Sequence, residues 1–155
     1  MIRPGAPEDL DALAELAGDT GLFSAEDLGV FRGMMEETLA APDDLAGFWV
    51  VDQTVGLRAA AYTAPEMMTD GVWNIVFIGV RAAERGQGHG AALIRHVEER
   101  LNMLDARLLL VETSSDASLA GARAFYPRLG FEEEARIRDY YQDGEDKIVF
   151  RKALG

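Results

Sequence analysis

A glycine-rich segment between an apolar run and an amphipathic run most constrains how this chain can fold. The segment is Arg85-Gly86-Gln87-Gly88-His89-Gly90; residues 72–80 before it are apolar, and the amphipathic run after it continues to residue 103. The apolar run predicts a strand buried on both faces, and the spacing over 88–103 predicts a helix. A glycine-rich turn that opens a helix presents backbone N–H groups with no Cβ atoms in the way. The sequence therefore predicts a strand, an anion-binding loop and a helix in direct succession.

The rest of the chain predicts an α+β fold. Helical spacing is found over residues 7–18, from an N-cap at Ser24 to a stop at Pro42, and over residues 118–129 before Gly130. Strand patterns cover residues 2–3, 48–51, 55–62, 72–80, 107–113, 131–141 and 147–152, with a polar turn over 142–146. Strand 72–80, helix 88–103 and strand 107–113 follow one another closely enough to form a parallel βαβ unit. We expect one domain over residues 1–155: an α/β three-layer arrangement with a mixed, mostly antiparallel sheet of six to seven strands and about four helices.

Composition argues against several kinds of function. The chain has no cysteine, which removes disulfides, thiolate nucleophiles and cysteine-ligated zinc and fits a reducing cytoplasm. Its net charge of −12 argues against nonspecific nucleic-acid binding, and no apolar run approaches membrane-spanning length. The two histidines do not have the spacing of a metal site. We therefore expect a cytoplasmic protein that binds no nucleic acid, no membrane and no metal.

The glycine segment is compatible with three kinds of cofactor. Gly86, Gly88 and Ala91 fit a dinucleotide-binding pattern, with Glu112 as the ribose-binding acid. The run from Glu84 to Gly90 fits the acid-x-G-x-G-x-G pattern of a site that binds a methyl donor. However, residues 81–85 separate the strand from the glycines, and residues 113–155 offer one helix and one hairpin instead of further βα units. Both alternatives therefore fit the chain poorly.

The third interpretation rests on a resemblance. The glycine segment resembles the R/Q-x-x-G-x-G/A signature of the GNAT superfamily of acyl-CoA N-acyltransferases, and Val80-Arg81 resembles its usual strand exit. Tyr126, Gly130 and Phe131 resemble a second marker of that superfamily, Y-x-x-x-G-F at the end of a helix. The resemblance extends over residues 1–153 and implies a GNAT-like fold. It also implies an N-acetyltransferase that moves the acetyl group of acetyl-CoA directly to a primary amine of a small molecule or peptide.

The resemblance implies where coenzyme A would bind. Its pyrophosphate would lie on the N-terminus of helix 88–103, and its pantetheine arm would pair with the preceding strand where the two parallel strands separate. We expect a β-bulge at Gly79 to start that separation. The cofactor-binding residues implied in this way are Ile78, Gly79, Val80, Arg85, Gly86, Gln87, Gly88, His89, Gly90 and Ala91.

The resemblance also implies catalytic residues. Tyr126 matches the tyrosine that serves as general acid for the departing thiolate. The family often has a glutamate base on strand 73–80, but the polar side chain there is Asn74. Glu112, in the next apolar strand, is the candidate base, and a water relay is the alternative.

The acceptor is less well defined than the cofactor. Candidate acceptor-side residues are Tyr62, Trp73, Asp139, Tyr140 and Tyr141, and the acid-rich residues 132–146 favour a cationic amine. A homodimer is compatible with the sequence. A non-catalytic acyl-CoA-binding or sensor domain of the same fold remains the alternative function.

Overall fold

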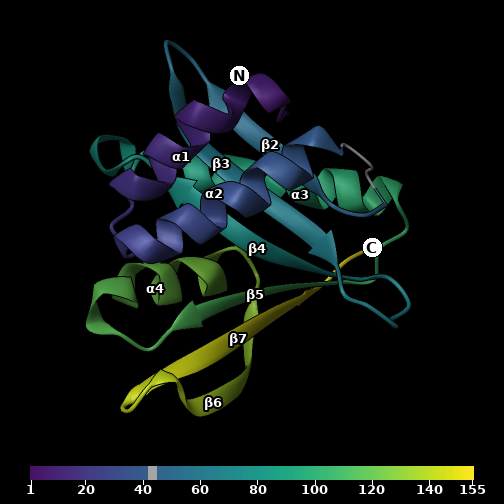
Figure 1. Ribbon diagram of the computed structural model, residues 1–155. Coiled ribbons are helices and arrows are strands. Elements are labelled where there is room, and N and C mark those ends of the chain that lie inside the picture. The colour runs from purple at the N-terminus through teal and green to yellow at the C-terminus, as the bar shows by residue number, and fades with distance from the viewer. Residues whose placement is uncertain (42–44) are drawn as a thin grey trace.

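In the computed structural model, which describes residues 1–41 and 45–155, seven strands form one mixed sheet (Figure 1). The strands are β1 (Ile2–Pro4), β2 (Phe48–Gln53), β3 (Leu57–Pro65), β4 (Val72–Val80), β5 (Leu108–Ser114), β6 (Glu132–Gln142) and β7 (Glu145–Ala153). Their order is β1-β2-β3-β4-β5-β7-β6, and among the described strands only β4 and β5 pair in parallel. The predicted α+β fold with one parallel βαβ unit is confirmed. A dinucleotide fold would need further parallel strands.

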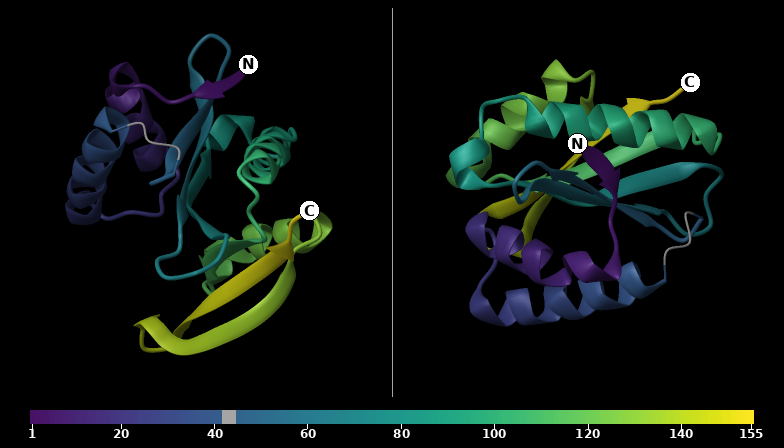
Figure 2. Two further views of the ribbon diagram at one scale, coloured as in Figure 1. Left: turned by 90° about the vertical axis from the view of Figure 1, so that its right-hand side faces the viewer. Right: turned by 90° about the horizontal axis from the view of Figure 1, so that it is seen from above.

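Helices cover both faces of this sheet. They are α1 (Leu10–Asp19), α2 (Ala25–Ala40), α3 (His89–Met103) and α4 (Ala120–Arg128). Helices α1 and α2 lie on one face and α3 on the other, where α4 also packs (Figure 2). The predicted N-cap of α2 is confirmed, because the Ser24 side chain accepts a hydrogen bond from the Asp27 N–H at 3.1 Å. The predicted stop at Pro42 lies outside the described residues.

Two hydrophobic cores fix the helices to the sheet. Leu93, Ile94 and Val97 of α3 are fully buried against sheet residues on one face. Burying one such side chain contributes about 1.5–3 kcal/mol. Trp73 belongs to this core and Tyr62 to the core under α1 and α2, with exposed fractions of 6% and 8%. These two acceptor-side candidates are therefore core residues.

The parallel strands β4 and β5 pair over only part of their length. Their register runs from Val72 opposite Leu108 to Ile75 opposite Val111, and beyond this point they diverge toward α4 (Figure 1). On the other side of β4, the register with β3 shifts so that Val76 is left unpaired. This β-bulge lies where the separation begins.

The predicted bulge at Gly79 is wrong. Gly79 pairs regularly with Ala60. A Cβ atom on Gly79 would lie 2.7 Å from Cζ of Phe77 and 3.1 Å from Cγ2 of Thr20. Glycine is required there because the Phe77 ring occupies the space, not because the strand bends.

A bidentate ion pair fastens β1 to the helical turn that precedes α1. Arg3 donates to both carboxylate oxygens of Asp9 at 2.9 Å, and the Ala6 N–H donates to Oδ2 at 2.8 Å. The hydrogen bonds from Arg3 lower the pKa of Asp9, although burial opposes the shift. The pair therefore stabilises the fold only while Asp9 is ionised.

We expect Asp9→Asn to lower the free energy of unfolding at pH 7 by about 1–3 kcal/mol. A lowered native pKa contributes stability above the unfolded pKa, and this contribution is lost as pH falls through the native value. The difference between variant and wild type should therefore shrink between about pH 5 and pH 2, measured by urea unfolding. Asp11→Asn is the control, since Asp11 pairs with Arg32 but its side chain is 90% exposed. A difference that stays constant with pH would contradict this account.

Candidate active site

A cleft of about 730 Å³ opens where β4 and β5 separate. It is lined by the end of β4, the glycine loop, the start of α3, the residues around the start of α4 and the connection after α1. Nine of the ten predicted cofactor-binding residues line it: Ile78, Gly79, Val80, Arg85, Gly86, Gly88, His89, Gly90 and Ala91. Gln87 does not line the cleft, and its side-chain amide donates to the carbonyl of Ala83 at 3.5 Å.

The glycine loop presents the N-terminus of α3 to this cleft. Gly86 and Gly88 have left-handed backbones, with φ of 77° and 86°, and a Cβ atom on either would meet nothing within 4 Å. Gly88 is the N-cap of α3, and no side chain caps the helix there. The N–H groups of the first turn of a helix lack intrahelical partners, and the helix dipole is positive at this end. The loop can therefore hold an anion.

Gly90 lines the cleft and also makes room for an aromatic side chain. A Cβ atom there would lie 3.2 Å from Cζ of Phe125. This glycine makes room for the ring of Phe125, which lines the cleft, and so it brings α4 close to the start of α3. Arg85 also links the loop to its surroundings, because its guanidinium donates to the carbonyls of Val80 and Thr20 at 3.4 and 3.3 Å.

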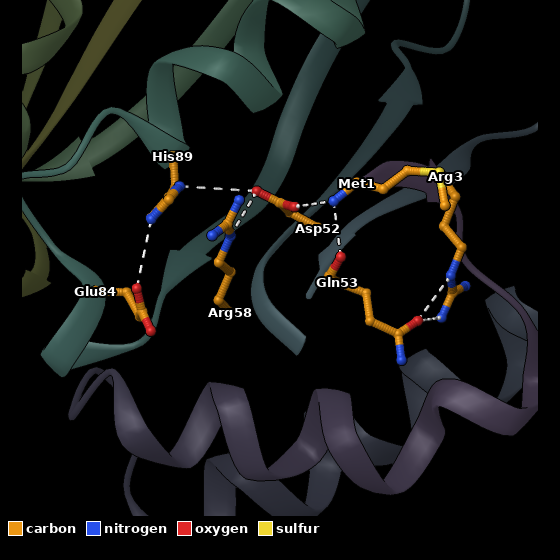
Figure 3. A network of polar contacts seen from close by, with 7 residues as sticks. All are labelled: Met1, Arg3, Asp52, Gln53, Arg58, Glu84 and His89. Atoms are coloured by element: carbon orange, nitrogen blue, oxygen red, sulfur yellow. Dashed lines mark hydrogen bonds and ion pairs between the residues drawn. The ribbon is translucent and has the colours of Figure 1, made fainter. Parts of the chain in front are cut away.

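The side chain of His89 turns toward two carboxylates (Figure 3). Its Nδ1 lies 3.9 Å from Asp52 and its Nε2 lies 3.5 Å from Glu84, and the side chain is only 13% exposed. Burial of Asp52 would raise its pKa, but hydrogen bonds from Arg58 and the terminal ammonium of Met1 hold it below the usual value. The His89 side chain thus lies between the glycine loop and Asp52 of β2.

Tyr126 lines the cleft from α4 and packs among aromatic rings. Its ring centroid lies 5.4 Å from that of Phe125, 5.8 Å from Phe131 and 5.5 Å from Phe150. Burial raises the pKa of Tyr126 to about 12. The phenol is therefore protonated at neutral pH, which is the state that a proton donor needs.

Glu112 lies on the other face of the sheet from Tyr126. Its neighbour Val111 is buried in the core that contains Tyr126, and adjacent strand residues point to opposite faces. Glu112 does not line the cleft, and its Oε1 forms an ion pair with Nζ of Lys147 at 2.6 Å. It is nevertheless the first residue of β5 beyond the pairing with β4.

Several cleft residues carry no sequence signal of their own. Thr20, Gly21 and Leu22 follow α1, and Ser118, Leu119 and Gly121 lie at the start of α4. They reach the cleft only because the sheet brings α1 and α4 beside the glycine loop. Among the described residues, no group of three or more histidines or acids could hold a metal ion, and no helix has the length and apolarity to cross a bilayer.

Comparisons with known proteins agree with this geometry. The acetyltransferase (GNAT) domain family matches residues 44–133, more than half of the chain. An N-acetyltransferase of Methanocaldococcus jannaschii is 28% identical over 140 residues, which cover 84% of this chain and 88% of that protein. The glycine segment, residues 85–90, and the marker formed by Tyr126, Gly130 and Phe131 therefore both lie inside the matched acetyltransferase domain. This chain belongs to the GNAT acetyltransferase family.

Solved structures show the same fold. A Desulfovibrio desulfuricans protein assigned to the GNAT acetyltransferases superposes with a TM-score of 0.93 at 27% identity, covering 100% of this chain and 99% of that one. The PaiA N-acetyltransferase of Thermoplasma acidophilum, solved in complex with coenzyme A, gives a TM-score of 0.80 at 15% identity, covering 99% and 98%.

Proposed function

We propose that this chain transfers the acetyl group of acetyl-CoA directly to a primary amine of a small molecule or peptide. The observation that carries the proposal is one cleft that joins the uncapped N-terminus of α3 to the phenol of Tyr126. Its volume of about 730 Å³ suits a cofactor-sized ligand. The coenzyme A complex of the PaiA relative supports the same ligand here.

The cofactor would bind along the cleft in two parts. The pyrophosphate would accept hydrogen bonds from the backbone N–H groups of residues 85–91, where the helix dipole favours negative charge. The pantetheine arm would pair with the backbone of Ile78, Gly79 and Val80. Among the described strands, β4 has no partner on its β5 side beyond Ile75, so these backbone groups are available.

The transfer itself needs one nucleophile and two proton movements. The amine nitrogen attacks the thioester carbonyl carbon, and the C–S bond breaks as the tetrahedral intermediate collapses. Tyr126 donates a proton to the departing sulfur, and Glu112 accepts the proton that the amine loses, directly or through water. Binding both reactants in one place removes much of the entropic cost of a bimolecular reaction.

Acetyl-CoA turnover against a panel of amines tests this proposal. The panel should contain a monoamine, a diamine, an aminoglycoside and a lysine-containing peptide, with thiol release followed by Ellman's reagent. Because the chain contains no cysteine, every thiol detected comes from coenzyme A. We expect thiol release and a mass-verified acetyl amide for at least one amine. Tight cofactor binding by calorimetry with background thiol release for every amine would instead indicate a sensor domain.

A further inference from the structure

We propose that Lys147, supported by the ring of Tyr140, is a positioning residue that orients the Glu112 carboxylate where β4 and β5 separate. Lys147 holds one carboxylate oxygen and leaves the other for the acceptor amine. This inference rests on the proposed function, in which Glu112 takes the proton of the amine. It assigns a role to the β6–β7 hairpin, which contributes no residue to the cofactor cleft.

Glu112 lies where β4 and β5 stop pairing and begin to separate. The parallel register ends with Ile75 opposite Val111, so the next positions are Val76 on β4 and Glu112 on β5. Val76 is unpaired and 52% exposed, and the Glu112 side chain is 26% exposed. A carboxylate at this point is open to a solvent-borne amine and adjacent to the separated strands.

Lys147 makes two contacts that fix this carboxylate. Its ammonium lies 2.6 Å from Oε1 of Glu112 and 4.3 Å from the centroid of the Tyr140 ring. Burial alone would lower the pKa of Lys147, but the hydrogen bond and charge of Glu112 raise it above the usual value. The Lys147 side chain is only 16% exposed, so water screens this ion pair less than a surface pair.

A large bulge in β6 brings Tyr140 over the lysine. The register of β6 and β7 shifts between Ile137, opposite Lys147, and Gln142, opposite Glu145. Four residues of β6 therefore face one residue of β7 in this interval, and Tyr140 is among them. Without the bulge, the alternation of side chains along β6 would not place the Tyr140 ring over Lys147.

Hydrogen bonds hold the bulge in a conformation that is unfavourable by itself. Asp139 has φ of 58°, which costs roughly 1–2 kcal/mol for a residue with a Cβ atom. Its N–H donates to Oδ1 of Asp146 at 3.0 Å, and its own Oδ1 accepts from the Gly144 N–H at 2.8 Å. The Asp146 N–H donates to Oγ of Ser115 at 2.7 Å, which anchors the hairpin just after β5.

The neighbouring acid Glu145 has hydrogen-bond partners of its own, whereas Glu112 pairs with Lys147. The second acid nearby, Glu145, accepts hydrogen bonds from the Ser114 hydroxyl and, at 2.8 Å, from the Gln142 amide. Tyr141 also lies close to this pair, since its pKa is raised by burial and by the charge of Glu112. Lys147 is therefore the β7 cation that forms an ion pair with Glu112, at 2.6 Å.

Kinetics of Lys147→Met and Lys147→Arg test the positioning role. Methionine keeps most of the length of the side chain but removes its charge, and we expect kcat to fall roughly 10–100-fold through misplacement of the base. The KM for acetyl-CoA should change less than about twofold, because the hairpin does not line the cleft. Arginine can still pair with Glu112 and should restore most of kcat. Tyr140→Leu removes the ring that lies over Lys147 and should lower kcat.

A double-mutant cycle separates positioning from a general structural effect. In a Glu112→Gln background, Lys147→Met should cause no further loss of kcat, because the lysine acts through the carboxylate. Normal kcat in Lys147→Met, or losses that add in the double variant, would overturn the positioning role and leave the proposed function intact. Normal kcat in Glu112→Gln would overturn the base assignment itself. Far-ultraviolet circular dichroism confirms that each variant is folded.

Discussion

Replacing Tyr126 with phenylalanine is expected to lower kcat roughly 10²–10⁴-fold, the usual contribution of a general acid. The affinity for coenzyme A should stay within about threefold of wild type, because the ring that lines the cleft is retained. The variant removes one oxygen atom from a side chain that no described residue hydrogen-bonds through its hydroxyl. No partner is therefore left unsatisfied, and the fold should be nearly as stable as before.

The surroundings of Tyr126 allow this substitution without a change in packing. The ring is packed by Phe125, Phe131 and Phe150, so phenylalanine fills the same space. The raised pKa adds a second expectation. A proton donor is lost as pH rises through its pKa, so the ionisation of Tyr126 should not lower turnover until pH approaches about 12.

Tyr62→Phe is the matched control for this experiment. Tyr62 is also a buried tyrosine, but it belongs to the core under α1 and α2 and does not line the cleft. Its variant should keep wild-type kcat and KM. If steady-state assays give Tyr126→Phe the same kcat as Tyr62→Phe, Tyr126 is not the general acid.

Most of the lining of the cleft around the start of α3 could be predicted because it is contiguous in sequence. A strand, a glycine turn and a helix in succession determine most of an anion site, since the backbone supplies the donors. The same chain segment also contains the error at Gly79. Nothing in the local pattern marks Val76 as a bulge, because it is an apolar β-branched residue among others of its kind. The bulge is defined by the register with β3, which is a tertiary feature.

The contact between Glu112 and Lys147 could not be predicted, because the two residues meet only in the folded chain. Glu112 and Lys147 are far apart in sequence, and no periodicity connects them. The predicted turn over 142–146 was also too long, since Gln142 and Glu145 already pair. β6 is an edge strand exposed at every residue, so it lacks the alternation that reveals a half-buried strand. Its charges and bulges are typical of edges that resist pairing with other chains.

Replacing Gly88 with aspartate is expected to lower the affinity for coenzyme A at least about 100-fold, while the protein stays folded. A Cβ atom at Gly88 points into open space at the N-terminus of α3, so the new carboxylate would occupy the pyrophosphate position. Two unit charges about 4 Å apart interact by roughly 1–4 kcal/mol near a protein surface, and a pyrophosphate carries more than one charge. The backbone φ of 86° costs the folded state about 1–2 kcal/mol, which aspartate tolerates better than most residues.

Gly88→Asn separates charge from shape in this experiment. Asparagine has nearly the size of aspartate and the same tolerance of positive φ, but it carries no charge. Calorimetry should therefore rank coenzyme A affinity as wild type, then Gly88→Asn, then Gly88→Asp. S-acetylpantetheine, which lacks the pyrophosphate, should be turned over equally by all three proteins. Normal coenzyme A affinity in Gly88→Asp, with thermal unfolding confirming a folded protein, would show that the glycine loop does not hold the pyrophosphate.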